Sequence, residues 1–130
     1  MNLLKKIVFI LLALVLAGVI GVVTTFYFLT GDSPFNDKEF DQKVWLSMDT
    51  DWDPDNPRGK MYEDIVDNHL EKGMSKQQVV DLLGQPDLKN KSLLFSYNLG
   101  MWSGFRMDYD SLDLVFNSSA NLEKFYRVQH

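Results

Sequence analysis

The sequence contains no cysteine and only two histidines among its 130 residues. The absence of cysteine excludes disulfide bonds, thiolate catalysis and cysteine-ligated metal sites. Basic residues are also few, since 13 Lys and Arg stand against 18 Asp and Glu for a formal net charge of −5. No run of Lys or Arg interrupts this acidic balance. Phosphate groups would therefore be repelled, so we expect no nucleic-acid partner and no attraction of the folded part to anionic lipids.

A long apolar run occupies the start of the chain. Ile7 to Leu29 carries no charge over about 23 residues, and a span of the hydrocarbon core needs roughly 20. The apolar region of a secretory signal peptide covers only about 7–15 residues. We therefore expect residues 7–29 to stay in the membrane as a signal anchor. Cleavage after Ala17 is the alternative, because Val15-Leu16-Ala17 can be cut by a signal peptidase.

The distribution of charge around this run predicts its orientation. Lys5 and Lys6 precede it, whereas Asp32 and Asp37 lie just after it. The whole chain after Leu29 holds 11 basic and all 18 acidic residues, a net charge of −7. The positive-inside tendency then places the N-terminus in the cytoplasm. We expect a single-pass protein of the inner (cytoplasmic) membrane whose C-terminal domain is extracytoplasmic. Leu16-Ala17-Gly18 resembles the start of a lipobox, but Val19 stands where a lipoprotein carries its acylated cysteine.

The remaining part of the chain is long enough for one modest core. Residues 1–30 are expected to be the anchor, 31–57 a linker with a short helix and an acidic loop, and 58–130 a folded domain. Asn36 or Asp37 can cap the short helix, which we expect to run to Trp45. A second helix is predicted from about Lys60 to Leu70, where apolar residues recur at helical spacing.

The segment from Gly73 to Pro86 gives the clearest helix signal. Ser75 followed by Gln78 forms the pattern of a capping box. Gly84 suits the residue that ends a helix, and Pro86 prevents the helix from resuming. We therefore predict a helix that begins after Ser75 and ends at Gly84.

Beyond Asp87 the apolar period changes from 3.6 to 2, as in half-buried strands. The alternating apolar positions are Leu93, Phe95, Tyr97 and Leu99, then Leu112, Leu114 and Phe116, and a last strand is expected from Leu122 to Val128. The predicted fold class is α+β: a transmembrane helix, then two short helices packed on a three-stranded antiparallel sheet.

Candidate sites were weighed against simpler structural roles. Alternate carboxylates in Asp49–Asp55 suggest a calcium loop, but Pro54 and Lys60 stand where an EF-hand needs Gly and Glu. Whether this loop binds calcium by another geometry stays open. His130 is expected to be frayed at the chain end, and Arg58 is expected to pair with Asp64.

No nucleophile elbow, P-loop or dinucleotide-binding glycine pattern is present. We therefore predict no catalytic residue, no cofactor and no metal site. The segment between the first two predicted strands combines aromatic residues with arginine, the types enriched at protein interfaces. The candidate interface residues are Met101, Trp102, Phe105 and Arg106. The alternative is that Trp102 and Phe105 fold back over the sheet.

The helix and the strands carry a series of short motifs: Gly73-Met74-Ser75, Val79, Leu82-Leu83-Gly84-x-Pro86-Asp87, Tyr97-x-Leu99-Gly100 and Leu112-x-Leu114-x-Phe116. Together they resemble the BamE-like (SmpA/OmlA) family over about residues 58–128. The wider superfamily includes β-lactamase-inhibitor-type domains. The resemblance implies a non-enzymatic bacterial envelope protein that binds other envelope proteins, as BamE does in the outer-membrane β-barrel assembly machine. An extracytoplasmic inhibitor or ligand-sensing domain is the alternative that the superfamily implies.

Overall fold

The computed structural model describes residues 2–29, 33–48 and 53–130, which form two compact units, residues 1–33 and 34–130. The first unit is the helix α1 (Leu3–Leu29). Its stretch Leu3–Tyr27 is long and apolar enough to cross a membrane, and none of it is buried. Thr24 and Thr25 donate their hydroxyl hydrogens to backbone carbonyls one turn earlier in the helix. The helix thus has the character of a signal sequence or membrane anchor.

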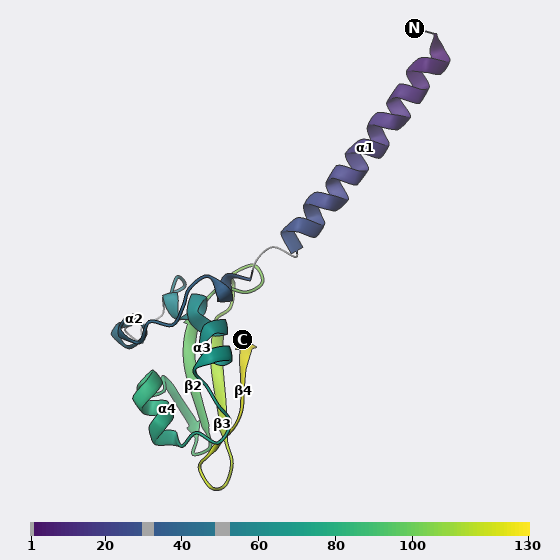
Figure 1. The fold of residues 1–130 in the computed structure, drawn as a ribbon. Coiled ribbons are helices and arrows are strands. Elements are labelled where there is room, and N and C mark those ends of the chain that lie inside the picture. Colours follow the sequence, from purple (N-terminus) through teal and green to yellow (C-terminus); the bar gives the residue numbers. More distant parts are fainter. Residues whose placement is uncertain (1, 30–32, 49–52) are drawn as a thin grey trace. The chain divides into compact units, whose positions relative to one another are not determined.

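The second unit is an α+β domain, as predicted (Figure 1). Its helical elements are η1 (Pro34–Asn36), α2 (Gln42–Ser47), η2 (Pro57–Met61), α3 (Tyr62–Asn68) and α4 (Lys76–Leu83). Its strands are β1 (Leu88–Lys91), β2 (Leu94–Gly100), β3 (Asp110–Phe116) and β4 (Leu122–Gln129). They form one antiparallel sheet in the order β1-β2-β3-β4. The three predicted strands are present, and β1 adds a short fourth strand at the edge.

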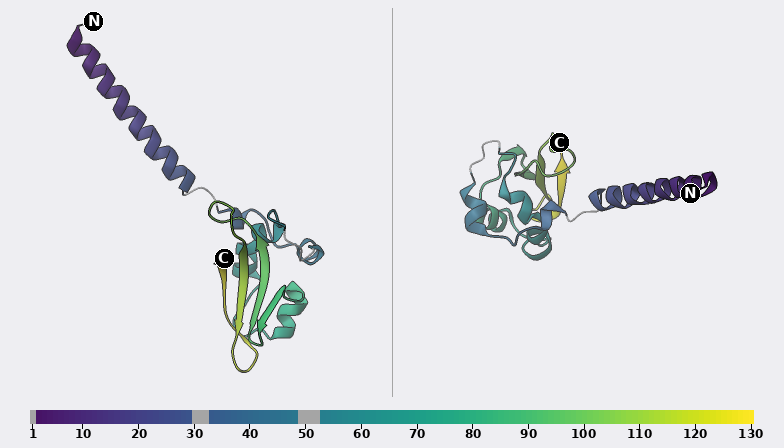
Figure 2. Two further views of the ribbon diagram at one scale, coloured as in Figure 1. Left: turned by 180° about the vertical axis from the view of Figure 1, so that it is seen from behind. Right: turned by 90° about the horizontal axis from the view of Figure 1, so that it is seen from above.

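The register of the sheet divides its side chains between two faces. Phe95 lies opposite Leu114 and Tyr97 opposite Leu112, and these side chains are buried. They join one core with apolar side chains of the helices, which therefore cover this face. Figures 1 and 2 show the other face of the sheet without a covering element. The packing of short helices on an antiparallel sheet confirms the predicted architecture.

The helix α4 has the predicted ends. Ser75 accepts a hydrogen bond from the Gln78 backbone N–H at 3.2 Å, and Gln78 accepts one from the Ser75 backbone N–H at 2.8 Å. This reciprocal pair completes the capping box. Gly84 ends the helix with a φ of 77°, a conformation that glycine adopts without steric cost.

The helices before α4 differ from the prediction. Asp41, rather than Asn36 or Asp37, caps α2, because its carboxylate accepts the backbone N–H of Val44 at 3.1 Å. Trp45 of this helix is fully buried in the core. The segment expected as a linker therefore supplies part of the domain from Pro34 onward. Between Lys60 and Leu70, the regular α-helix covers only Tyr62–Asn68 and follows the 3₁₀ helix η2.

Candidate interaction site

The connection between β2 and β3 is the segment that the sequence indicates as an interface; we call residues 101–109 the aromatic loop. Asp110, the first residue of β3, holds the base of this loop. Its fully buried carboxylate accepts hydrogen bonds from the backbone N–H groups of Trp102 at 3.0 Å and Ser103 at 2.9 Å. The Ser103 hydroxyl and the Arg127 guanidinium bind its other oxygen at 2.6 and 3.0 Å. Arg127 therefore neutralises the buried carboxylate, and the three uncharged donors orient it.

Trp102 folds back against the domain. Its indole N–H donates to the backbone carbonyl of Asn56 at 2.9 Å. The ring lies against Gly59, where an added Cβ would come within 2.1 Å of the Trp102 Cδ1 atom. Lys60 Nζ and Arg106 Cζ lie 5.1 and 5.0 Å from the ring centroid, within the range of cation–π attraction. Trp102 thus fixes the loop to the segment that precedes α3.

Arg106 closes the loop from the other side. Its Nε–H donates to the Met101 carbonyl at 2.8 Å, and its guanidinium forms an ion pair with Asp55. The backbone of Arg106 has a φ of 56°, which is uncommon for a residue other than glycine. Met101 in turn donates its backbone N–H to the Pro54 carbonyl at 2.9 Å. The end of the acidic loop and the aromatic loop are therefore tied together.

The candidate interface residues do not share one role. Met101 and Trp102 are partly buried and brace the loop, whereas Phe105 and Arg106 are exposed. The Phe105 side chain is 95% exposed, so it does not fold over the sheet. Met107, which the sequence reasoning did not include, is 77% exposed beside it. The use of this loop as an interface remains a prediction, with Phe105 and Met107 as its accessible apolar side chains.

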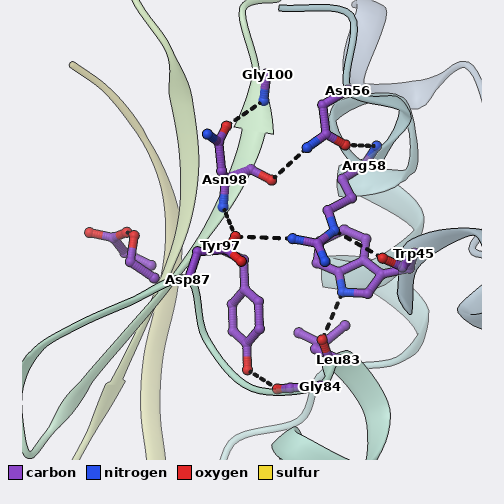
Figure 3. Close-up of polar contacts among 11 residues, drawn as sticks. Trp45, Asn56, Arg58, Leu83, Gly84, Asp87, Tyr97, Asn98 and Gly100 are labelled. Atoms are coloured by element: carbon purple, nitrogen blue, oxygen red, sulfur yellow. Dashed lines mark hydrogen bonds and ion pairs between the residues drawn. The ribbon is translucent and has the colours of Figure 1, made fainter. Parts of the chain in front are cut away.

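A buried polar cluster connects the helices to β2 (Figure 3). The Arg58 guanidinium donates to the Trp45 carbonyl at 3.0 Å and pairs with Asp87 Oδ2 at 3.0 Å. The same Asp87 oxygen accepts the backbone N–H of Asn98 at 2.7 Å. The prediction that Arg58 pairs with Asp64 is therefore wrong.

Burial changes the titration of this cluster. Loss of hydration lowers the pKa of Arg58, while the negative charge and hydrogen bond of Asp87 act in the opposite direction. Burial also raises the pKa of Tyr97, whose hydroxyl donates to the Gly84 carbonyl at 2.9 Å. Asp87 Oδ1 is buried without a hydrogen-bond partner in the part of the chain that the structure describes. The pair with Arg58 is thus the main compensation for the Asp87 charge.

The open face of the sheet carries a second polar group. Asp113 Oδ1 accepts the hydroxyls of Ser96 at 2.6 Å and Ser111 at 2.9 Å, and Ser111 Oγ also lies 2.9 Å from His130 Nε2. Because Asp113 contacts the serine and not the imidazole, the group lacks the order of a catalytic triad. The His130 ring stacks on Tyr109 at 4.1 Å. The expectation that His130 is frayed is therefore wrong.

Residues 49–52, much of the acidic loop, lie outside the described residues, so the open question of calcium binding is untested. Asp53 accepts the backbone N–H of Asp55 at 2.9 Å, as in an Asx turn. Among residues 2–29, 33–48 and 53–130, no three His, Asp or Glu side chains lie close enough together to hold a metal ion.

The chain was also compared with known proteins. No family model, no curated protein and no solved structure matches it.

Proposed function

We propose that this chain is a non-enzymatic accessory protein of the bacterial cell envelope. Residues 7–29 anchor it in the inner membrane, and its α+β domain lies on the extracytoplasmic side, where it binds other envelope proteins. The apolar surface of α1 carries the anchoring part of the proposal. All its described side chains are exposed, and such an apolar surface is not stable in water. A bilayer provides the environment in which the helix is stable.

The fold supports kinship with the BamE-like family. In that arrangement a capped helix packs on an antiparallel meander, as α4 packs here on β2 and β3. Likeness of fold is weak evidence about function. The proposal therefore transfers only the class of role, namely binding to envelope proteins, and not membership of the β-barrel assembly machine.

We assign the contacts with partner proteins to the open face of the sheet. Tyr126 and Leu88 are each 45% exposed there, at the two ends of one cross-strand row. Leu94 and Val115 form a cross-strand pair in the neighbouring row of the same face. A face that combines these aromatic and aliphatic side chains with the exposed Lys124, opposite Val115, has the mixed character of non-obligate interfaces.

Photo-cross-linking in cells tests this assignment. A photoreactive phenylalanine analogue at Tyr126 is expected to capture a discrete envelope protein. The matched control is the same analogue at Lys72, an exposed position before α4, which is expected to capture nothing specific. A β-barrel assembly subunit as the adduct would support the BamE-like role, whereas an envelope enzyme would favour the inhibitor alternative. If Tyr126 gives no more adduct than Lys72, the open face is not the interface.

A further inference from the structure

We propose that the tip of the aromatic loop, Phe105 with Met107, is a second membrane contact that enters the interface of the bilayer holding α1. The inference rests on the proposed function, because it requires α1 to be anchored in a bilayer. Phe105 and Met107, at 95% and 77%, are the two most exposed large apolar side chains among the described residues of the domain. Their exposure leaves a compact apolar tip for which the domain itself provides no cover.

The tip is held in this exposed position. The buried Asp110 fixes the backbone of Trp102 and Ser103 at one end of the loop. Gly104 and Arg106 both have a φ of 56°, which turns the chain sharply on either side of Phe105. Because several hydrogen bonds maintain these turns, the outward direction of Phe105 is a property of the folded loop.

The loop lies at the end of the sheet where the chain enters the domain (Figures 1 and 2). The Phe35 ring of η1 lies 4.0 Å from the Arg127 guanidinium, and Arg127 pairs with Asp110 at 3.0 Å. The entry point and the base of the aromatic loop are therefore linked through one arginine. The turn between β3 and β4 lies at the opposite end of the sheet.

The sequence between α1 and the domain is short. Only residues 30–33 separate Leu29 from Pro34, and such a segment spans at most about 18 Å when fully extended. A helix of about 23 apolar residues is roughly 35 Å long and reaches the edge of a hydrocarbon core of about 30 Å. Pro34 is therefore confined near the lipid headgroups whatever the orientation of the domain.

The chemistry of the tip fits a lipid interface. Aromatic and thioether side chains can enter the boundary between headgroups and acyl chains. Two side chains bind a bilayer only weakly, but the tether makes the contact intramolecular and raises its effective concentration. The net negative charge of the domain opposes electrostatic adsorption, so the contact must be apolar and must also form on zwitterionic lipid.

The test uses the whole chain, which has no native cysteine, in phosphatidylcholine vesicles. Single cysteines replace Asp108 beside the tip, Ser118 in the β3–β4 turn and Leu14 in α1, and each carries a nitroxide label. Collision with membrane-soluble oxygen and with a water-soluble nickel chelate reports the depth of each label. We expect Leu14 to report the bilayer interior, Asp108 the interface and Ser118 water. We expect the double substitution Phe105→Ser with Met107→Ser to change the collision rates of the Asp108 label to those of the Ser118 label. The collision rates of the Leu14 label should not change.

Two results would overturn the contact while leaving the anchor intact. One is an Asp108 label that matches Ser118, which would show that the tip stays in water. The other is an Asp108 label that lies at the interface and keeps the same depth after the double serine substitution. A Leu14 label that reports water would instead overturn the proposed anchor, and the contact with it.

Discussion

At the scale of single residues, Arg58 connects parts of the domain that lie far apart in sequence. Its side chain binds the Trp45 carbonyl in α2 and the Asp87 carboxylate before β1. The guanidinium carbon lies 4.8 Å from the Trp45 ring centroid, close enough for cation–π attraction. A buried ion pair contributes little net stability relative to apolar residues, but loss of one partner leaves the other charge uncompensated.

Arg58→Ala should therefore destabilise the domain strongly. We expect the free energy of unfolding to fall by about 3–5 kcal/mol, because the buried Asp87 charge would lose its cation. Denaturant unfolding followed by tryptophan fluorescence, with α1 held in detergent, measures the change. Lys72→Ala, at an exposed position, is the control and should have little effect. A loss below about 1 kcal/mol, typical of an exposed ion pair, would contradict the account.

The environment of Asp64 implies that the stability of the domain depends on pH. The N–H of Phe40, at 2.7 Å, and the Asn68 amide lower the pKa of its carboxyl. A carboxyl whose pKa is lower in the folded than in the unfolded chain stabilises the fold above its unfolded pKa of about 3.9. That contribution is lost as the pH falls through the lower, folded pKa.

Asp64→Asn should consequently reduce stability at pH 7 and have a smaller effect near pH 3. Unfolding free energies of both proteins at the two pH values provide the measurement, with Asp67→Asn on the exposed side of α3 as the matched control. If Asp64→Asn lowered the free energy of unfolding equally at both pH values, the ionised carboxylate of Asp64 would not be the source of the pH dependence.

The residues that sequence reasoning identified correctly are those whose environment is set by periodicity. Met61, Leu112 and Leu114 are buried as their spacing predicts. The partner of Arg58 was missed because Asp87 is 29 residues away, and no local pattern relates two such positions. In the aromatic loop, composition identified the segment, but only the fold distinguishes the bracing Trp102 from the exposed Phe105.

At the scale of elements, α4 was predictable because its signals are local. Its cap, its apolar face and its terminating glycine all lie within Ser75–Gly84. The strand β1 was missed because Leu88-Lys89-Asn90-Lys91 has no apolar alternation and pairs only at the edge of β2. The start of α2 was misplaced because three candidate caps precede it, and the burial of Trp45 against distant segments favours Asp41.

Ser75→Ala tests the capping box of α4 directly. We expect a loss of about 1 kcal/mol in unfolding free energy, because the Gln78 backbone N–H loses its acceptor. The exposed Ser92 supplies the control, since Ser92→Ala keeps the backbone carbonyl that Lys76 contacts. Equal effects of the two substitutions in the same denaturation experiment would show that the cap does not stabilise the helix.

At the scale of the whole molecule, the chain combines an apolar helix with an acidic domain. The helix has two lysines before its apolar run, and all acidic residues follow that run. The two lysines before the run are the physical basis of our proposal that the domain lies outside the cytoplasm. The proposed contact of the open sheet face with envelope proteins depends on that placement, whereas the contact of the loop tip with lipid depends only on the anchoring of α1.

Labelling of introduced cysteines in intact cells tests the placement most directly, because the native chain has none. A cysteine at Ser118 should react with a membrane-impermeant maleimide that passes the outer membrane, while a cysteine at Asn2 should react only after lysis. Both labelled chains should sediment with the inner membrane. Protection of Ser118 until lysis, or recovery of the domain in the soluble periplasmic fraction without its first 17 or so residues, would contradict the anchored, extracytoplasmic account.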